Sequence, residues 1–164
     1  FDLLIPAFQH IAADFPSWHL RILGDGFDRA KLQAQITSLG MESRISLPGR
    51  AGNVGQWYEA ADAYVMSSRF EGFPNTLVEA MAHGLPAIGF DCDTGPRDII
   101  RHEVDGLLVS TGDSQALEQA LRRLMADENL RKQFANRAIE VRERFSMERI
   151  AGMWEELFED LLHR

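Results

Sequence analysis

Apolar positions along the chain alternate between a helical spacing and short continuous or alternating runs typical of strands. The first segment has helical spacing, and we expect a helix that ends near Asp14, ahead of Pro16. Five short apolar runs follow and predict strands at residues 19–23, 44–47, 63–66, 86–90 and 106–109. Helix-like segments separate these runs, so the order predicts a parallel sheet covered on both faces.

The expected helices have residues typical of helix boundaries at their ends. Gly40 and Gly84 are placed to end two helices, and Pro96 is placed to begin another. Asp113 or Ser114 and, further on, Ser146 are placed to cap two more. We expect helices at residues 30–39, 54–60, 76–83, 96–101 and 113–125, and an almost continuous helical tail from residue 128 with a break near 145–146. No linker or repeat interrupts the pattern, which predicts one doubly wound, Rossmann-like α/β domain over residues 1–164.

Composition narrows the functional classes. The 164 residues, of which 45% are hydrophobic and 26% charged, are enough for one globular domain. The net charge of −8 argues against a nucleic-acid binder. Cys92 is the only cysteine, which excludes an internal disulfide and a cysteine-rich metal site and fits a reducing compartment. The chain also has no apolar run near the roughly 20 residues of a spanning helix.

The segment from Glu71 to Glu79 is the most informative one, because it lies where the third strand ends and a helix begins. Ligands of open parallel sheets bind at that edge. Gly72 allows close backbone approach, Pro74 pre-sets the turn, and the first helical amides are free to face an anion. These amides belong to Asn75, Thr76 and Leu77.

The two carboxylates of this segment repel phosphate, but they can accept hydrogen bonds from hydroxyl groups. The loop thus has amides that can donate hydrogen bonds to a phosphate and carboxylates that can accept them from hydroxyl groups. This combination suggests a ligand with both phosphate and hydroxyl groups, such as a nucleotide-sugar. Each feature also has a purely structural interpretation. Thr76 and Glu79 fit a capping box, Glu71 fits a solvated loop charge, and the loop from Gly72 fits an ordinary turn.

Other strand-end loops add candidates for the same crevice. Gly24 and Gly26 follow the first strand, but the third glycine of a dinucleotide fingerprint is missing, so they form either a plain turn or part of a nucleotide pocket. Arg50 follows the second strand and could meet a phosphate, stack on a base or remain solvated. Residues 94–98 open a further helix and could face the same site.

Residues 71–82, followed by Gly84-Leu85-Pro86, resemble the donor-site motif of retaining glycosyltransferases with the GT-B architecture of two Rossmann-like domains. Sucrose synthase and bacterial glycogen synthase share this motif. The resemblance extends in order through residues 23–26, 47–49, 61–68 and 105–109 and covers nearly the whole chain. The variants at 72–75 and 95–98 are similar to the branch that builds bacterial surface polysaccharides.

The resemblance implies a role for each matching position. Glu71 would be the catalytic-site residue that contacts hydroxyls of the donor sugar, and Glu79 would accept the ribose hydroxyls. The backbone from Phe73 through Pro74 to Asn75 would touch the sugar, and the amides of Thr76 and Leu77 the diphosphate of a UDP-sugar. Gly24, Gly26 and Arg50 would border the nucleotide. The nucleotide-sugar is a substrate, and neither a cofactor nor a metal is expected.

The resemblance also implies parts that the chain does not contain. Family members have an N-terminal acceptor-binding domain, and an arginine and a lysine that neutralise the diphosphate; both cations should lie upstream of Phe1. We therefore expect an N-terminally truncated donor domain that is inactive alone, whose last helix, about 146–163, packs toward the missing half. The full-length enzyme would be cytoplasmic, with peripheral membrane association through that half.

Three alternatives remain at this level. A nucleotide-sugar epimerase has a similar two-domain shape, and a non-catalytic nucleotide-binding module would keep the fold without needing Glu71. A response-regulator-like signalling domain is the third, but it requires a cluster of aspartates at the strand ends, which the sequence does not supply.

Overall fold

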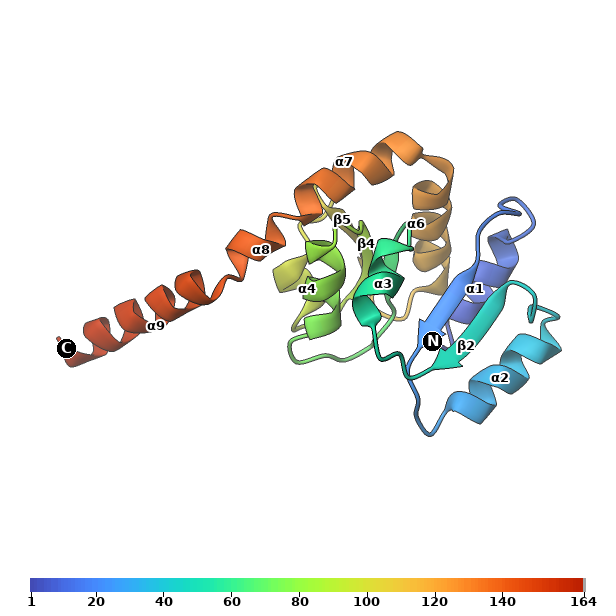
Figure 1. The fold of residues 1–164 in the computed structure, drawn as a ribbon, viewed down its shortest axis with the longest axis horizontal. Helices are drawn as coiled ribbons and strands as arrows, with labels where there is room; N and C mark the ends of the chain where they lie inside the picture. Colours follow the sequence, from blue (N-terminus) through green and yellow to red (C-terminus); the bar gives the residue numbers. More distant parts are fainter. Residues whose placement is uncertain (164) are drawn as a thin grey trace.

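The computed structural model describes residues 1–163, and its strands confirm the predicted α/β class (Figure 1). All strands pair in parallel, at positions within two residues of the expected ones: β1 (Leu20–Leu23), β2 (Ile45–Gly49), β3 (Tyr64–Met66), β4 (Ala87–Asp91) and β5 (Gly106–Ser110). β2 runs on through Pro48, which lacks an N–H donor; it is exposed, and a sheet edge tolerates such a residue.

Helices fill the intervals between the strands and form the tail: α1 (Leu4–Ile11), α2 (Arg29–Ser38), α3 (Val54–Glu59), α4 (Asn75–Ala82), α5 (Pro96–Ile99), α6 (Ser114–Ala126), α7 (Glu128–Ala138), α8 (Val141–Arg144) and α9 (Met147–Leu162). The predicted boundary residues are confirmed at several ends. The Asp113 and Ser146 side chains accept from the backbone N–H groups of Ala116 and Arg149, and Gly40 and Gly84 take positive φ values of 64° and 80°. The first helix ends earlier than expected, because the chain tightens into three-residue turns after Ile11.

The strands form two sheets, β1–β2 and β3–β4–β5, rather than the single sheet that the alternating pattern suggests. Both sheets nevertheless share one core, in which Ile22 and Ile45 of the first sheet pack with Ile88 and Phe90 of the second. The first four residues of β4 are buried, as expected for a central strand covered on both faces. β3 pairs on one side only, and Tyr64 and Val65 are half-buried.

The apolar faces of α1 and α6 pack against each other and join the same core. Their buried residues follow helical spacing: Leu4, Ile5, Phe8 and Ile11 in α1, and Leu117, Leu121 and Leu124 in α6. These two helices therefore tie the β1–β2 sheet to the larger sheet.

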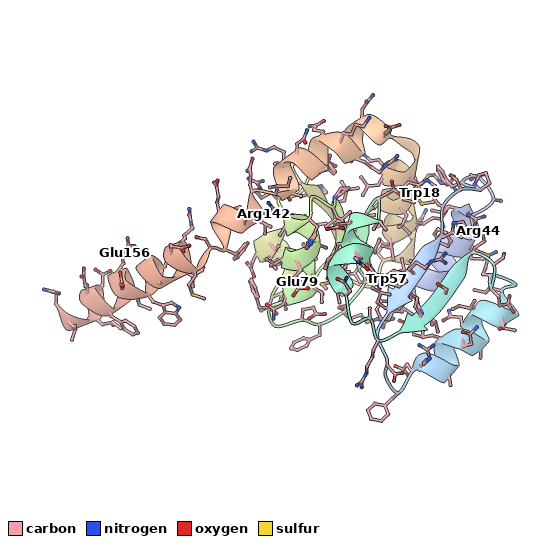
Figure 2. The ribbon with its side chains drawn as sticks, in the orientation of Figure 1. Trp18, Arg44, Trp57, Glu79, Arg142 and Glu156 are labelled. Atoms are coloured by element: carbon pink, nitrogen blue, oxygen red, sulfur yellow. The ribbon has the colours of Figure 1, made fainter. Side chains whose placement is uncertain are left out.

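The tail crosses α4 before it leaves the body of the molecule. α7 and α8 contact α4, and Arg142 of α8 donates to the carbonyl of Ala82 at the end of α4, 2.8 Å away (Figure 2). Such a cation satisfies an unpaired carbonyl and suits the negative end of the helix dipole. α9 then projects away from the body, and none of its described residues is buried.

A buried carboxylate anchors this tail. Asp105 has no exposed surface, and it accepts hydrogen bonds from the backbone N–H and the Nε of Arg101, at 2.8 and 2.6 Å. Arg101 also donates to Glu140, 2.8 Å away, while Arg144 of α8 lies 3.5 Å from Asp105. The network fixes the start of α8, and with it the position of α8 on α4.

Candidate functional site

The segment from Glu71 to Glu79 forms a loop after β3 and the first turns of α4, as the sequence predicts. Pro74 is the extended residue before the helix, with φ −80° and ψ 91°. Within residues 1–163, the amides of Asn75 and Thr76 have no recorded acceptor, whereas that of Leu77 donates to the Pro74 carbonyl at 3.0 Å. Of the three amides expected to face an anion, two are therefore available.

Glu79 is held by a helix that is distant in sequence. The hydroxyl of Tyr58, in α3, lies 3.2 Å from Glu79 Oε2 and 3.3 Å from the carbonyl oxygen of Thr76. Figure 2 labels Glu79 on α4 and Trp57, the residue before Tyr58, on α3. Glu79 itself is exposed, and its Oε1 has no recorded partner in the described part of the chain. One carboxylate oxygen is thus fixed and the other is open to a ligand.

The alternative interpretation of Glu79 as part of a capping box is wrong. α4 begins at Asn75, so Thr76 is the second helical residue and not the cap, and no side chain caps this helix end. A capping box needs the carboxylate three positions after the cap, and Glu79 is five positions after Pro74. The helix start therefore leaves Glu79 available for another partner.

Two tyrosine hydroxyls surround the start of α4 and remain donors at neutral pH. Burial raises the pKa of Tyr58, and the neighbouring Tyr64 and Glu79 raise it further. Burial also raises the pKa of Tyr64, which the hydrogen bond to Thr76 opposes and the charges of Glu71 and Glu79 reinforce. Tyr64 donates to Thr76 Oγ1 at 2.9 Å, so both hydroxyls stay protonated and orient polar groups of α4.

Glu71 is half-buried in the loop, and its carboxylate has no recorded partner within residues 1–163. Its backbone is held instead, because the Thr94 hydroxyl donates to the Glu71 carbonyl. The ring of Phe73 stacks edge-on against Phe145, with the ring centres 5.5 Å apart. The carboxylate is therefore free to accept a hydrogen bond from a ligand, while the chain around it is fixed.

The glycine-rich loop lies at the end of the other sheet. Gly24, with φ 116°, donates its N–H to the Gly49 carbonyl at 2.8 Å, which holds the ends of β1 and β2 together. Gly24 and Gly26 line a cavity of about 330 Å³. Arg50 follows β2 and is exposed beside this loop, but it does not line the cavity.

Residues at the N-terminal end of the chain link the two loops. Phe1 lines the cavity at Gly24. Asp2 forms a bidentate ion pair with Arg69, whose two guanidinium nitrogens lie 3.1 and 2.7 Å from the two carboxylate oxygens. Arg69 lies two positions before Glu71. Among the residues described, no hydrogen bond joins the two loops directly, so this connection is the one the structure provides between the Glu71 segment and the glycine-rich loop.

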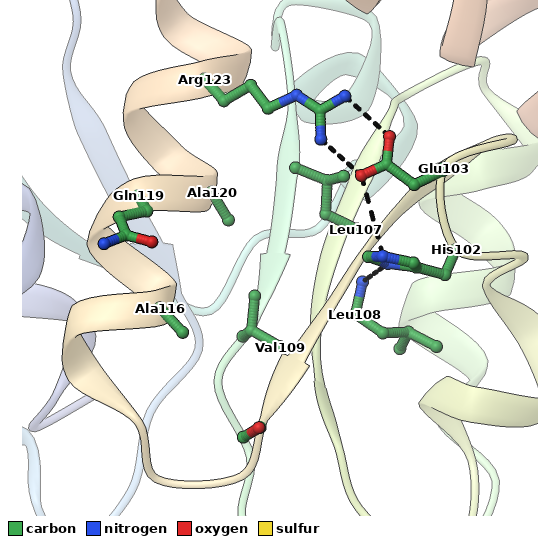
Figure 3. Close-up of a pocket in the computed structure, with 10 residues that line it drawn as sticks. His102, Glu103, Leu107, Leu108, Val109, Ala116, Gln119, Ala120 and Arg123 are labelled. Carbon is green, nitrogen blue, oxygen red and sulfur yellow. Dashed lines mark hydrogen bonds and ion pairs between the residues drawn. The ribbon is translucent and has the colours of Figure 1, made fainter.

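A second cavity, of about 340 Å³, lies between β5 and α6 (Figure 3). Its charged lining residues neutralise each other, because Arg123 binds both carboxylate oxygens of Glu103, at 2.5 and 2.7 Å. His102 accepts from the backbone N–H of Leu108 at 3.0 Å and is also engaged. This cavity therefore offers no uncompensated cation for a phosphate and is a weaker candidate than the Glu71–Glu79 segment.

Two residues important at the site escaped the sequence analysis. Tyr58 carries no motif, and only its place on an apolar helix face could have indicated packing near α4. Arg69 belongs to a loop in which charge is common. Within residues 1–163, no three His, Cys, Asp or Glu side chains are grouped to hold a metal ion, and no helix has the length and apolar character needed to cross a membrane.

Comparison with known proteins is consistent with this geometry. Residues 1–141 match the family described as glycosyl transferases group 1. An exopolysaccharide phosphotransferase of Streptomyces coelicolor is 40% identical over 164 residues, and a lipopolysaccharide 1,6-galactosyltransferase of Salmonella typhimurium is 38% identical over 127 residues. These matches cover 99% and 74% of the chain but only 17% and 35% of the two relatives.

The fold is also similar to a solved structure with a bound nucleotide. The crystal structure of Staphylococcus aureus TarM with fondaparinux, α-GlcNAc-glycerol and UDP superposes with a TM-score of 0.89 at 26% identity. The superposition covers 96% of the chain and 32% of TarM. A family match over most of the chain, joined to this agreement in fold, shows that the chain belongs to the glycosyl transferases of group 1.

Proposed function

We propose that the chain is the donor-binding half of a retaining GT-B glycosyltransferase, and that it binds a UDP-sugar at the start of α4. The observation that carries this proposal is the arrangement around Glu79. Tyr58 fixes one of its carboxylate oxygens, the other is open, and the amides of Asn75 and Thr76 are free four and three residues away. This helix end therefore has a carboxylate that can accept hydrogen bonds from a diol and amides that can donate to a phosphate, and both suit a nucleoside diphosphate.

The chemistry of each group assigns it a part of the ligand. Glu79 accepts the vicinal ribose hydroxyls, and the free α4 amides face the diphosphate. Glu71 accepts hydroxyls of the donor sugar, because its carboxylate repels the phosphates and has no partner among the described residues. Gly24 and Gly26 line the cavity that receives the base, with Arg50 at its margin. The UDP in the TarM crystal structure supports uridine as the nucleoside.

Catalysis in this proposal relies on positioning and on stabilising the leaving diphosphate. The carboxylate of Glu71 contributes by orienting the sugar, and the α4 amides contribute by facing the charge that develops on the diphosphate. In this proposal the nucleotide-sugar is a substrate, and no metal is assigned a role.

The rest of the full-length protein supplies the acceptor site. The apolar residues of α9 are open in the structure: Met153, Trp154, Leu157, Phe158, Leu161 and Leu162 are each at least 46% exposed. We propose that this stripe packs against the N-terminal acceptor-binding domain, so that the chain alone binds nucleotide weakly and transfers no sugar. The names of the two relatives support a glycan or lipid-linked glycan as acceptor. We also propose that the full-length enzyme is cytoplasmic and associates peripherally with the membrane.

The decisive experiment supplies the full-length protein with UDP-glucose, UDP-galactose and UDP-N-acetylglucosamine together with a lipid-linked glycan extract. NMR spectroscopy of the product then reports both transfer and anomeric configuration. We expect transfer with retention. An epimerised nucleotide-sugar would favour the epimerase alternative, and transfer of a phosphosugar would favour the activity in the name of the Streptomyces coelicolor relative. Either result would contradict the proposal.

A further inference from the structure

We propose that residues 92–95, here called the brace, position Glu71 for the donor sugar, with Thr94 and Gly95 as its positioning residues. The inference rests on the proposed function, since it assigns the brace a part in the same site. Through Glu71, the brace acts on the end of the site that binds the sugar and not on the end that binds the nucleotide. The brace connects β4 to α5 and contributes no atom to α4.

The first contact of the brace is a hydrogen bond to the loop that contains Glu71. The Thr94 hydroxyl donates to the carbonyl of Glu71, a residue 23 positions earlier. Glu71 has no other recorded hydrogen bond in the described chain, so Thr94 is the group that holds its backbone. A loop residue without such a bond would sample several backbone conformations, and its carboxylate would move with them.

The second contact is steric and requires glycine. Gly95 has φ 89°, and a Cβ atom there would lie 2.7 Å from Pro74 Cδ, 3.1 Å from the Gly72 carbonyl oxygen and 3.3 Å from Glu71 Cβ. The first distance is shorter than van der Waals contact allows, and Pro74 is too rigid to yield. The backbone of Gly95 therefore packs directly against Pro74, Gly72 and Glu71, and a side chain at position 95 would disrupt this contact.

The brace is itself anchored at both ends. At the β4 end, the Cys92 N–H donates to the Phe90 carbonyl at 2.9 Å, and the buried Cys92 thiol lies 3.3 Å from the Thr94 carbonyl oxygen. At the α5 end, the Gly95 N–H donates to Asp98 Oδ2 at 3.2 Å. Because the brace is fixed at both ends, it holds the backbone of Glu71 in a constant position relative to β4.

The nucleotide end of the site depends on different contacts. Glu79 is held by Tyr58, and Thr76 by Tyr64, and neither bond involves the brace. Loss of the Thr94 hydroxyl should therefore alter affinity for the sugar moiety and spare affinity for UDP. A Cβ atom at position 95 would in addition displace Pro74, which precedes the α4 amides. A purely structural role would instead weaken the binding of both ligands together.

The test compares ligands that differ only in the sugar. Isothermal titration calorimetry on the full-length protein would give Kd for UDP and for UDP-glucose, UDP-galactose and UDP-N-acetylglucosamine. The variants are Thr94→Val, which removes the hydroxyl, Thr94→Ser, which keeps it, and Gly95→Ala. Thr111→Val is the matched control, because Thr111 is exposed after β5 and has no recorded hydrogen bond within residues 1–163.

For the tightest UDP-sugar, we expect Thr94→Val to raise the ratio of its Kd to the Kd of UDP about three- to tenfold, the effect of one lost hydrogen bond. Gly95→Ala should weaken the binding of both UDP and the UDP-sugar, because Pro74 directly precedes the α4 amides. The Kd ratio of Thr94→Ser and of Thr111→Val should stay within about twofold of wild type. A ratio unchanged in Thr94→Val, with UDP binding intact, would overturn the inference and leave the proposed function standing. A wild-type protein that binds neither UDP nor any UDP-sugar would overturn the proposed function itself.

Discussion

Replacing Tyr58 with phenylalanine is the most informative perturbation of the nucleotide end of the site. The change removes one hydroxyl and keeps the ring, which packs 5.2 Å from the ring of His83 and 6.2 Å from that of Tyr64. Tyr58 is only 7% exposed, so the ring has little freedom to move. The substitution thus frees the Glu79 carboxylate while leaving the contact between α3 and α4 in place.

The expected effect on Kd for UDP follows from the distances between the Tyr58 hydroxyl and its two acceptors. One proton is shared between Glu79 Oε2 at 3.2 Å and the Thr76 carbonyl oxygen at 3.3 Å, both longer than the best O–H···O bonds. We therefore place the bond to the charged group just below the usual range for such bonds, at about 1–1.5 kcal/mol. If that energy is what holds Glu79 ready for the ribose, Kd for UDP should rise about five- to tenfold.

A double-mutant cycle tests whether the effect runs through Glu79. UDP affinity would be measured by calorimetry for full-length wild type, Tyr58→Phe, Glu79→Ala and the double variant. We expect the Tyr58→Phe effect to vanish in the Glu79→Ala background, a coupling of about 1 kcal/mol. Tyr64→Phe is the matched control, since its hydroxyl binds Thr76 and not Glu79. Equal effects of Tyr58→Phe in both backgrounds would refute the reasoning.

Three further predictions address the tail and its anchor. Asp105→Ala leaves Arg101 and Arg144 without their buried partner, and urea denaturation should show a loss of about 3 kcal/mol in the free energy of unfolding; a loss below about 1 kcal/mol would contradict the anchoring role. The hydrogen bond from Arg101 lowers the pKa of Glu140 from 4.5, so this stabilisation is complete above pH 4.5 and is lost as the pH falls through the lowered value. Tm should therefore fall more steeply with acid in wild type than in Glu140→Gln, and parallel curves would argue against the pair. Leu157→Glu on α9 should remove about 2 kcal/mol of burial and so lower the Tm of the full-length protein, yet keep Kd for UDP within about twofold; an unchanged Tm would show that the stripe stays uncovered.

Features that depend on nearby residues could be predicted from the sequence. The start of α4 after Pro74, the glycine that follows its end at Gly84 and the cap at Ser146 all depend on turn and capping chemistry within a few residues. The placement of the Glu71–Glu79 segment at a strand-to-helix junction has the same local origin.

Features that depend on packing between distant segments could not. Tyr58 and Glu79 are 21 residues apart, and Thr94 and Glu71 are 23 apart; only the packing of α3 on α4, and of the brace on the loop, brings them together. The capping-box interpretation failed because the helix cap is Pro74, two residues before the Thr76 that the pattern suggests. The division into two sheets could not be predicted either, because the apolar pattern of a strand does not determine which other strand it pairs with.

The central claim, that Glu79 binds the ribose of a nucleotide-sugar, is tested most directly by removing the ribose hydroxyls from the ligand. Calorimetry with the full-length protein would compare UDP and 2′,3′-dideoxy-UDP on wild type and on Glu79→Ala. We expect wild type to prefer UDP by about tenfold or more, as for hydrogen bonds to a charged group, and Glu79→Ala to lose most of that preference. The same preference for UDP in both proteins would contradict the account.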